Sequence, residues 1–367
     1  MTALEHIIKQ KIRERGPGGY MDLGEYMSLC LSHPEHGYYM TRDPFGQKGD
    51  FTTAPEISQM FGEMIGVWVA DTWIKMGSPK KIIILECGPG RGTLMADAMR
   101  VTKNVDGFHD AVQLHLLEMS PVLKDIQKDS LKEYGATWHS EPESVPTDSP
   151  LIVIGNEFLD ALPVRQLVFT ETGWQEKVVK ININDTLRLH EIGLKKEVKS
   201  LLPSFLIPPK LGDHVEVSLE LNDFINKITK IILNQGGSAL FLDYGFNQMI
   251  AGETLQAVKN HRYCDIFDTP GQADLSAHVN FADLSHKILE KNMTLHGPVS
   301  QRDFLKRLGI DIRAENLHRL ATQPQRVEID SALKRLTGED TGNGEMGTLF
   351  KVIAFSSDSS IDLAGFA

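Results

Sequence analysis

The amino-acid sequence predicts an α/β fold built on a doubly wound sheet. Three observations support this class. Short apolar runs suited to buried strands begin at residue 82, a stretch with helical spacing follows each of the first two runs, and a glycine-rich loop joins the first run to its helix. The length of 367 residues allows two or three domains, and the 41% hydrophobic content is enough for a substantial core.

The central part of the chain supplies the predicted sheet. Strands are expected at 82–86, 112–118 and 151–155, joined by helices at 93–101 and 122–134. After a pause, the alternation resumes with a helix at 221–234 and strands at 238–243 and 347–355. Between these last two strands, apolar spacing predicts helices at 281–290, 301–308 and 314–322.

Two further parts lie outside this alternation. Helical spacing predicts an N-terminal cap with helices near 4–12, 23–31 and 57–76. Runs typical of strands predict an inserted β-rich subdomain, with strands at 166–170, 176–183, 186–190 and 215–218. The predicted segments are therefore a helical cap and lid (1–80), the first part of the sheet domain (81–163), the insertion (164–220), and the second part of the sheet domain with a helical insertion on the substrate side (221–367).

Composition excludes several classes of function. The 38 basic and 49 acidic side chains give a net charge of −11 without a long basic stripe, so we expect no binding to nucleic acid. No apolar run approaches the roughly 20 residues of a membrane span, so we expect no membrane insertion. Three scattered cysteines indicate a reducing compartment, and the N-terminus matches neither a signal peptide nor a typical transit peptide. We therefore expect a cytoplasmic protein.

The segment Glu86-Cys87-Gly88-Pro89-Gly90-Arg91-Gly92 lies between the first predicted strand and its helix. Glycines at this place let the backbone turn tightly and let a ligand approach closely. A dinucleotide-binding loop would need glycine at position 93, where Thr93 stands. The carboxylate of Glu86 would repel a pyrophosphate and suit a cationic ligand such as S-adenosylmethionine, a sulfonium with an amino group. We therefore expect this loop to bind S-adenosylmethionine rather than NAD or ATP, through Glu86, Gly88, Gly90 and Gly92.

Glu118 ends the second predicted strand. A carboxylate there can accept hydrogen bonds from both hydroxyls of a ribose, and with the glycine loop it would form the ribose-binding half of a nucleoside pocket. The alternative is structural, with a plain turn at 88–92 and a helix-capping role for Glu118 or Ser120. The matching positions of Glu86 and Glu118 at two strand ends favour the cofactor interpretation.

Asn156, Glu157 and Asp160 follow the predicted strand at 151–155. Ligands of open α/β sheets bind beyond the carboxyl ends of the strands, so these side chains should face the same crevice as the glycine loop. Two carboxylates and an amide can orient a cationic or N–H-rich acceptor, which makes them the candidate catalytic residues. Alternatively, Asp160 caps a short helix and Glu157 is solvated.

The segment 49–58 has two interpretations. The structural one is a helix N-cap at position 53 or 54, before a proline in the first helical turn. The functional one is a lid in which Asp50, Thr52 and Thr53 reach the methionine part of the cofactor.

Two weaker signals are also present. Asp243 ends a predicted strand and either contacts the acceptor or only forms a turn. His33 and His36 have an H-x-x-H spacing, but they lie in a turn without a third type of ligand nearby, so we expect no metal site.

Eight segments together are similar to one known family. They are 49–58, 86–92, 116–121, 155–164, 242–245, 270–279, 297–301 and 346–352, and they occur in order along nearly the whole chain. These segments resemble the MidA family of class I methyltransferases. The family includes the mitochondrial complex I assembly-factor methyltransferase.

This resemblance implies a Rossmann-like, seven-stranded methyltransferase sheet, S-adenosylmethionine as the methyl donor, and protein arginine as the acceptor, with a respiratory complex I subunit as the implied substrate. It assigns the glycines of 86–92 to the cofactor loop and Glu118 to the ribose. The sequence lacks the paired-glutamate hairpin of the standard arginine methyltransferases, for which Glu157 and Asp160 are the substitutes present. Two other functions stay open: methyl transfer to another protein side chain or a small molecule, and a non-catalytic assembly factor that retains the fold.

Overall fold

The structure is a computed structural model, and it describes residues 2–46, 52–202, 208–247, 252–342 and 344–366. The chain forms two compact units, each assembled from three stretches of sequence. The first unit is made of Met1–Phe51, Asp160–Phe224 and Gln248–His278, and the second of Thr52–Leu159, Ile225–Asn247 and Val279–Ala367. The predicted cap (1–80) and the predicted insertion (164–220) thus both contribute to the first unit. The four predicted segments themselves stay a prediction.

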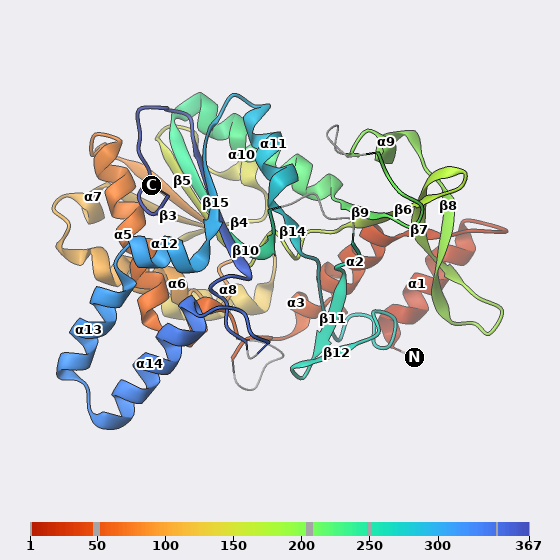
Figure 1. The fold of residues 1–367 in the computed structure, drawn as a ribbon, viewed down its shortest axis with the longest axis horizontal. Coiled ribbons are helices and arrows are strands. Elements are labelled where there is room, and N and C mark those ends of the chain that lie inside the picture. Colours follow the sequence, from red (N-terminus) through yellow and green to blue (C-terminus); the bar gives the residue numbers. More distant parts are fainter. Residues whose placement is uncertain (1, 47–51, 203–207, 248–251, 343, 367) are drawn as a thin grey trace. The chain divides into compact units, whose positions relative to one another are not determined.

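The second unit is built on an eight-stranded mixed sheet (Figure 1). Its strands are β2 (Ile82–Cys87), β3 (Val112–Leu117), β4 (Thr137–His139), β5 (Leu151–Asn156), β10 (Gly237–Phe246), β14 (Val279–Asn280), β15 (Thr294–Ser300) and β16 (Phe350–Ser356). The main order is β15-β16-β10-β5-β2-β3-β4, and β14 pairs with β10. Neighbouring strands from β10 to β4 are parallel. β16 is antiparallel to β10, and β15 is antiparallel to β16. The predicted α/β class is confirmed.

The central strands are apolar up to their carboxyl ends, as expected for strands with both faces covered. β2 and β5 are buried at every position. Parallel pairing also aligns their ends, since Cys87 of β2 lies opposite Leu117 of β3 and Gly155 of β5. The polar residues that follow these strands therefore gather at one edge of the sheet.

Ten helices or helix segments of the described residues belong to this unit. They are α4 (Ala54–Ile57), α5 (Gln59–Lys75), α6 (Thr93–Val101), α7 (Phe108–Ala111), α8 (Pro121–Ser130), most of α10 (Leu219–Gln235), α11 (Phe281–Leu289), α12 (Gln301–Arg307), α13 (Ile310–Leu320) and α14 (Gln323–Thr337). Two short 3-10 helices lie at Thr102–Asn104 and Pro142–Ser144. Across both units, no described helix is long and apolar enough to cross a membrane.

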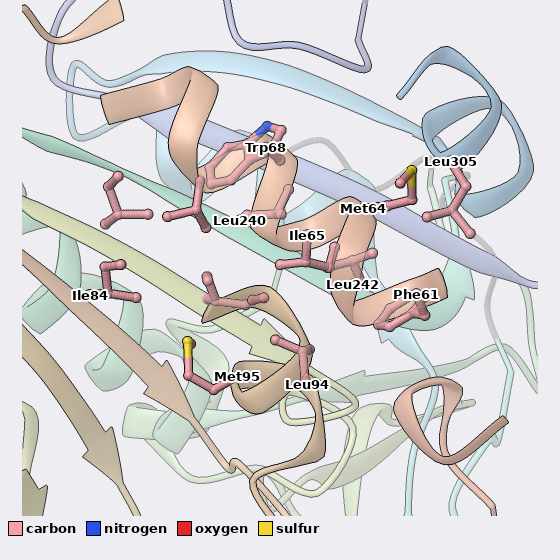
Figure 2. Close-up of a cluster of buried hydrophobic side chains, with 14 of the residues drawn as sticks. Phe61, Met64, Ile65, Trp68, Ile84, Leu94, Met95, Leu240, Leu242 and Leu305 are labelled. Carbon is pink, nitrogen blue, oxygen red and sulfur yellow. The ribbon is translucent and has the colours of Figure 1, made fainter. Parts of the chain in front are cut away.

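The core of this unit lies where α5 and α6 pack on the sheet (Figure 2). Buried side chains come from α5 (Phe61, Met64, Ile65, Trp68), α6 (Leu94, Met95), β2 (Ile84), β10 (Leu240, Leu242) and α12 (Leu305). Gly66 lets the two helices approach closely, because a Cβ there would lie 2.7 Å from the Cα of Ala98. This packing fixes α6, and with it the loop that precedes α6.

The predicted helix over 57–76 is confirmed as α5, which begins two residues later than expected because the chain breaks at Ser58. Ser58 has an extended backbone (φ −163°, ψ 140°), which separates α4 from α5. Its side-chain oxygen accepts a hydrogen bond from the Met60 amide at 3.2 Å and so caps α5. Apolar spacing continues across the break, so periodicity alone does not reveal it.

A partly buried ion pair attaches α13 to α5. Glu63 of α5 is fully buried, and its carboxylate accepts hydrogen bonds from Nε of Arg313 at 2.6 Å and from Nη2 at 2.8 Å. Arg100 of α6 adds a third at 2.9 Å. The bidentate geometry compensates for the burial of the charge. α14, which the sequence did not predict, lies beside α13 (Figure 1) and buries only a thin stripe of its surface.

The first unit contains two antiparallel sheets. In the larger sheet, β1 (Met21–Asp22), β7 (Gly173–Ile181), β6 (Arg165–Thr170) and β9 (His214–Val217) are neighbours in that order, and β8 (Leu187–Gly193) also pairs with β7. The smaller sheet has the order β12 (Arg262–Cys264), β11 (Gln256–Lys259) and β13 (Asp274–Ser276). The helices are α1 (Ala3–Glu14), α2 (Leu23–Ser32), α3 (Tyr38–Thr41) and α9 (Lys196–Lys199). The N-terminal helices and the inserted strands share one core, which includes Ile8, Tyr26 and Val179.

Replacing Ile65 with alanine should destabilise the protein by about 2–5 kcal/mol, because it removes a fully buried side chain from the α5 core. Ile74 on the same helix is 52% exposed, so Ile74→Ala is a matched control with a much smaller expected cost. Urea denaturation of the two variants measures both losses. Equal losses would contradict this packing of α5.

Candidate cofactor and acceptor site

The glycine loop connects β2 to α6 through left-handed backbone. Gly88, Gly90 and Gly92 have φ values of +64°, +55° and +80°, which L residues rarely adopt. A Cβ at Gly88 would also lie 2.9 Å from Cδ2 of Phe158. The backbone itself therefore requires glycine here, and these three positions present no side chain to an approaching ligand.

Glu86 lies at the end of β2 and is 3% exposed. Burial, together with the charge of Glu118, raises the pKa of its carboxyl to about 8. Its Oε2 has no hydrogen-bond partner among the described residues. Burying a carboxylate oxygen without a hydrogen-bond partner costs free energy unless a ligand supplies a donor or a positive charge. Glu86 therefore suits the cationic end of a ligand.

Glu118 follows β3 and is held by two neutral donors. Its Oε1 accepts a hydrogen bond from the Ser120 amide at 2.7 Å, and its Oε2 accepts one from Nε2 of Gln127 at 3.0 Å. Burial raises its pKa, and these two bonds act in the opposite direction. A carboxylate has about four acceptor sites, so both oxygens can accept a further donor such as a ribose hydroxyl. The cap of α8 is Ser120, whose Oγ accepts from the Leu123 amide at 3.2 Å.

Sequence reasoning missed Gln127 and its partner Trp138. Gln127 is fully buried, and the indole Nε1 of Trp138 donates to its Oε1 at 2.8 Å. One signal was present in the sequence: Gln127 follows Leu123 by four positions, and both are buried on the same face of α8. Trp138 had no such signal, because β4 has only three residues.

Asn156 and Glu157 form a hydrogen-bonded pair at the end of β5. Nδ2 of Asn156 donates to Oε1 of Glu157 at 3.1 Å, and the Ala54 amide donates to the same oxygen at 2.9 Å. Only the NH₂ of the Asn156 amide can donate to a carboxylate, which fixes the orientation of the amide. Its Oδ1 is buried and has no hydrogen-bond partner within the described ranges. Asn156 thus presents an acceptor, and Glu157 a negative charge, at the carboxyl end of the strand.

Asp243 of β10 holds the turn that contains Glu157. Its fully buried carboxylate accepts hydrogen bonds from the amides of Phe158 at 3.2 Å, Leu159 at 2.9 Å and Tyr244 at 2.9 Å. Glu157 has a φ of +51°, which is unusual for a residue with a side chain. Such backbone strain persists only where the surroundings impose it. Of the two interpretations of Asp243, the structure favours the turn-forming one.

The predicted lid is described in part. Asp50 lies outside the described residues. Thr52 and Thr53 belong to the second unit, and Thr53 occupies the N-cap position of α4 without a side-chain capping bond. The carboxylate of Glu157 serves α4 instead by accepting from Ala54. The roles of Thr52 and Thr53 toward a cofactor stay a prediction.

Asp160 belongs to the first unit, whereas Asn156 and Glu157 belong to the second. Its backbone oxygen accepts a hydrogen bond from the Ala277 amide at 3.0 Å. Burial raises the pKa of Tyr39, as do the charges of Asp274 and Asp160. The role of Asp160 beside Glu157 stays a prediction.

Within the part of the chain that the structure describes, no three metal-ligating side chains gather.

A family model described as "Putative S-adenosyl-L-methionine-dependent methyltransferase" matches residues 64–299, which is more than half of the chain. The chain belongs to this family. The similarity to the MidA family inferred from the sequence is therefore confirmed. The residues present fit the cofactor of the family, because Glu86 offers a buried carboxyl that a cationic group can ionise, Glu118 offers acceptors for a ribose, and the glycine loop permits close approach.

Two kinds of relative extend this result. The protein from Xenopus tropicalis named protein arginine methyltransferase NDUFAF7, mitochondrial, is 36% identical over 340 residues, which cover 86% of this chain and 77% of the relative. Its Drosophila melanogaster homologue is 35% identical and covers 95% and 83%. A Burkholderia thailandensis protein solved with bound S-adenosyl-homocysteine is 28% identical, with a TM-score of 0.83 and coverage of 100% and 94%.

These names correct the expected cellular location. The relatives are named as mitochondrial proteins, which contradicts the prediction of a cytoplasmic protein. That prediction used the scattered cysteines, which report a reducing environment and do not distinguish one reducing compartment from another.

Glu86→Gln should change the way stability depends on pH in the ligand-free protein. The folded-state pKa of Glu86, about 8, exceeds the unfolded value of 4.5, so this group makes the wild type lose stability as pH rises through that window. Relative to wild type, the variant should gain up to about 1.4 kcal/mol for each pH unit in the window. Denaturant unfolding at several pH values measures the difference. Glu133, which is 66% exposed, provides the control variant Glu133→Gln. If the difference in unfolding free energy between Glu86→Gln and wild type does not vary with pH, the burial of the Glu86 carboxyl is contradicted.

Glu118→Ala should weaken binding of S-adenosylhomocysteine by about 1–3 kcal/mol, because ribose hydroxyls would lose a charged acceptor. Titration calorimetry on the folded variant measures the dissociation constant. A value equal to that of wild type would mean that Glu118 serves only the local structure of the β3 end.

Proposed function

We propose that this protein transfers a methyl group from S-adenosylmethionine to an arginine side chain of a protein. The observation that carries the proposal is a pair of buried acceptor atoms, Oε2 of Glu86 and Oδ1 of Asn156, at the ends of neighbouring parallel strands. The relatives named protein arginine methyltransferases support arginine as the acceptor. We also assign the seven strands of the main path to the seven-stranded class I sheet, with β14 as an addition.

The cofactor half of the proposed site uses the ends of β2 and β3. Glu86 would bind the amino group and favour the sulfonium, Glu118 would accept from the ribose hydroxyls, and Gly88, Gly90 and Gly92 would let the cofactor lie against the backbone. When bound, S-adenosylmethionine supplies an electron-poor methyl group. Holding two reactants in line is worth roughly 7–11 kcal/mol, so positioning by these residues can provide much of the acceleration.

The acceptor half uses the end of β5. A guanidinium has a pKa of at least about 12.5, so removing its proton at pH 7 before transfer would cost roughly 7 kcal/mol. The protein therefore has to hold the cation and take up its proton as transfer proceeds. We assign this role to Glu157, and the hydrogen bonds that its carboxylate accepts from the Ala54 amide and from Asn156 support the assignment. Oδ1 of Asn156 can accept from an N–H of the guanidinium.

A labelling experiment tests the proposal. Mitochondrial extract is incubated with the protein and with S-adenosylmethionine that carries an isotopic methyl label, and the products are identified by mass spectrometry. Label on arginine of a protein, for instance of a respiratory complex I subunit, is the expected result. Label on another side chain or on a small molecule would mean that arginine is not the acceptor. Absence of label with intact cofactor binding would favour an assembly factor that has kept the fold.

Glu157→Gln should reduce methyl transfer by about 10²–10³, because it removes one charge that holds the cationic acceptor. The amide oxygen can still accept from Ala54 and Asn156, so we expect the fold and the affinity for S-adenosylhomocysteine to stay close to wild type. Single-turnover rates and calorimetry separate the two effects. Glu133→Gln is the control for charge removal at an exposed position. Transfer at the wild-type rate in Glu157→Gln would make Glu157 a structural cap of α4.

A further inference from the structure

Gln127 makes three hydrogen bonds inside the second unit and is fully buried. Its Nε2 donates to the backbone oxygen of Gly90 at 2.7 Å and to Oε2 of Glu118 at 3.0 Å. Its Oε1 accepts from the indole of Trp138 at 2.8 Å. One side chain thus contacts both the glycine loop and the carboxylate that follows β3.

The surroundings allow only one orientation of this amide. An indole N–H can only donate, so the atom that faces Trp138 is the oxygen. The Gly90 carbonyl and the Glu118 carboxylate accept, so the atom that faces them is the NH₂. Both amide hydrogens are used, one for each neighbour. An acid at position 127 would place acceptors against acceptors.

The short strand β4 supports the same arrangement from its other side. β4 pairs with β3 in parallel, so that Trp138 lies opposite Leu116. The amide of Glu118 donates to the backbone oxygen of His139 at 3.0 Å. β4 therefore holds the backbone of Glu118 directly and its carboxylate through Trp138 and Gln127.

We infer that Gln127 is a positioning residue that sets the Glu118 carboxylate and the Gly90 backbone at a fixed separation for the nucleoside. The inference rests on the proposed use of S-adenosylmethionine. It assigns Gln127 no contact with the cofactor. Without the NH₂ of Gln127, the Glu118 carboxylate would keep the backbone amides of Met119 and Ser120 as donors but would lose the side chain that connects it to the Gly90 backbone.

Calorimetric titration with S-adenosylhomocysteine tests this inference. Gln127→Leu keeps the approximate volume and removes both donors, and it should raise the dissociation constant about tenfold. In a Glu118→Ala background the same change should raise it less than about twofold, because the group that Gln127 positions is gone. Multiplicative effects in the double variant would overturn the inference and leave Gln127 with a packing role. Gln113→Leu, at an exposed position of β3, is the control and should bind as wild type does.

The pH profile of Gln127→Glu provides a second measurement. At high pH the new carboxylate would repel Glu118 and the Gly90 carbonyl, so the dissociation constant should rise well above that of wild type. As pH falls, the new carboxyl becomes protonated and can donate one hydrogen bond, so the ratio of variant to wild-type dissociation constants should decrease. A ratio that does not vary with pH would overturn the inference.

Two outcomes distinguish this inference from the proposed function. Failure of the wild-type protein to bind S-adenosylhomocysteine would contradict both the proposed function and the role of Gln127. Binding by wild type with unchanged binding by Gln127→Leu would remove only the role of Gln127. If thermal unfolding shows that Gln127→Leu does not fold, Trp138→Phe keeps an aromatic ring and removes the indole donor, and a rise of about two- to threefold in the dissociation constant is then expected. An unchanged constant in Trp138→Phe would count against the inference.

Discussion

Burial of two carboxylates at the ends of adjacent parallel strands is the constraint on which the rest of the site depends. Burial raises the pKa of Glu86, and the nearby charge of Glu118 raises it further. Glu118 is stabilised by donors from the protein itself. Glu86 has an oxygen for which the described residues supply no donor, so a positively charged ligand is the partner that would complete it.

A second set of contacts begins at the next strand of the sheet. The carboxylate of Asp243 fixes the turn after β5, that turn holds Glu157 in a left-handed conformation, and Glu157 in turn accepts from the first residue of α4. Three elements far apart in the sequence thus meet at one strand end. The proposed acceptor residues are therefore positioned by tertiary contacts rather than by a local motif.

The sequence predicted those features that repeat or that follow directly from strand ends. Most strands of the sheet and the helices between them were expected because their apolar periodicity is strong, and Glu86 and Glu118 were found because each ends such a predicted strand. The break at Ser58, the strand β4 and the helix α14 were not predicted. A one-residue break, a three-residue strand and a helix with a thin buried stripe each leave little periodic signal in the sequence. Gln127 and the role of Asp243 depend on contacts across the sequence, and the division of the chain between Leu159 and Asp160 could not be seen from spacing.

Proton release on cofactor binding tests the central claim most directly, because the claim is that a buried, largely protonated Glu86 becomes a charged partner of the ligand. Calorimetric titration of the wild-type protein with S-adenosylhomocysteine at about pH 7, in two buffers with different ionisation enthalpies, counts the protons exchanged. The structure predicts net release of up to about one proton, with the release lost in Glu86→Gln. Absence of binding, or equal proton release in the variant, would contradict it.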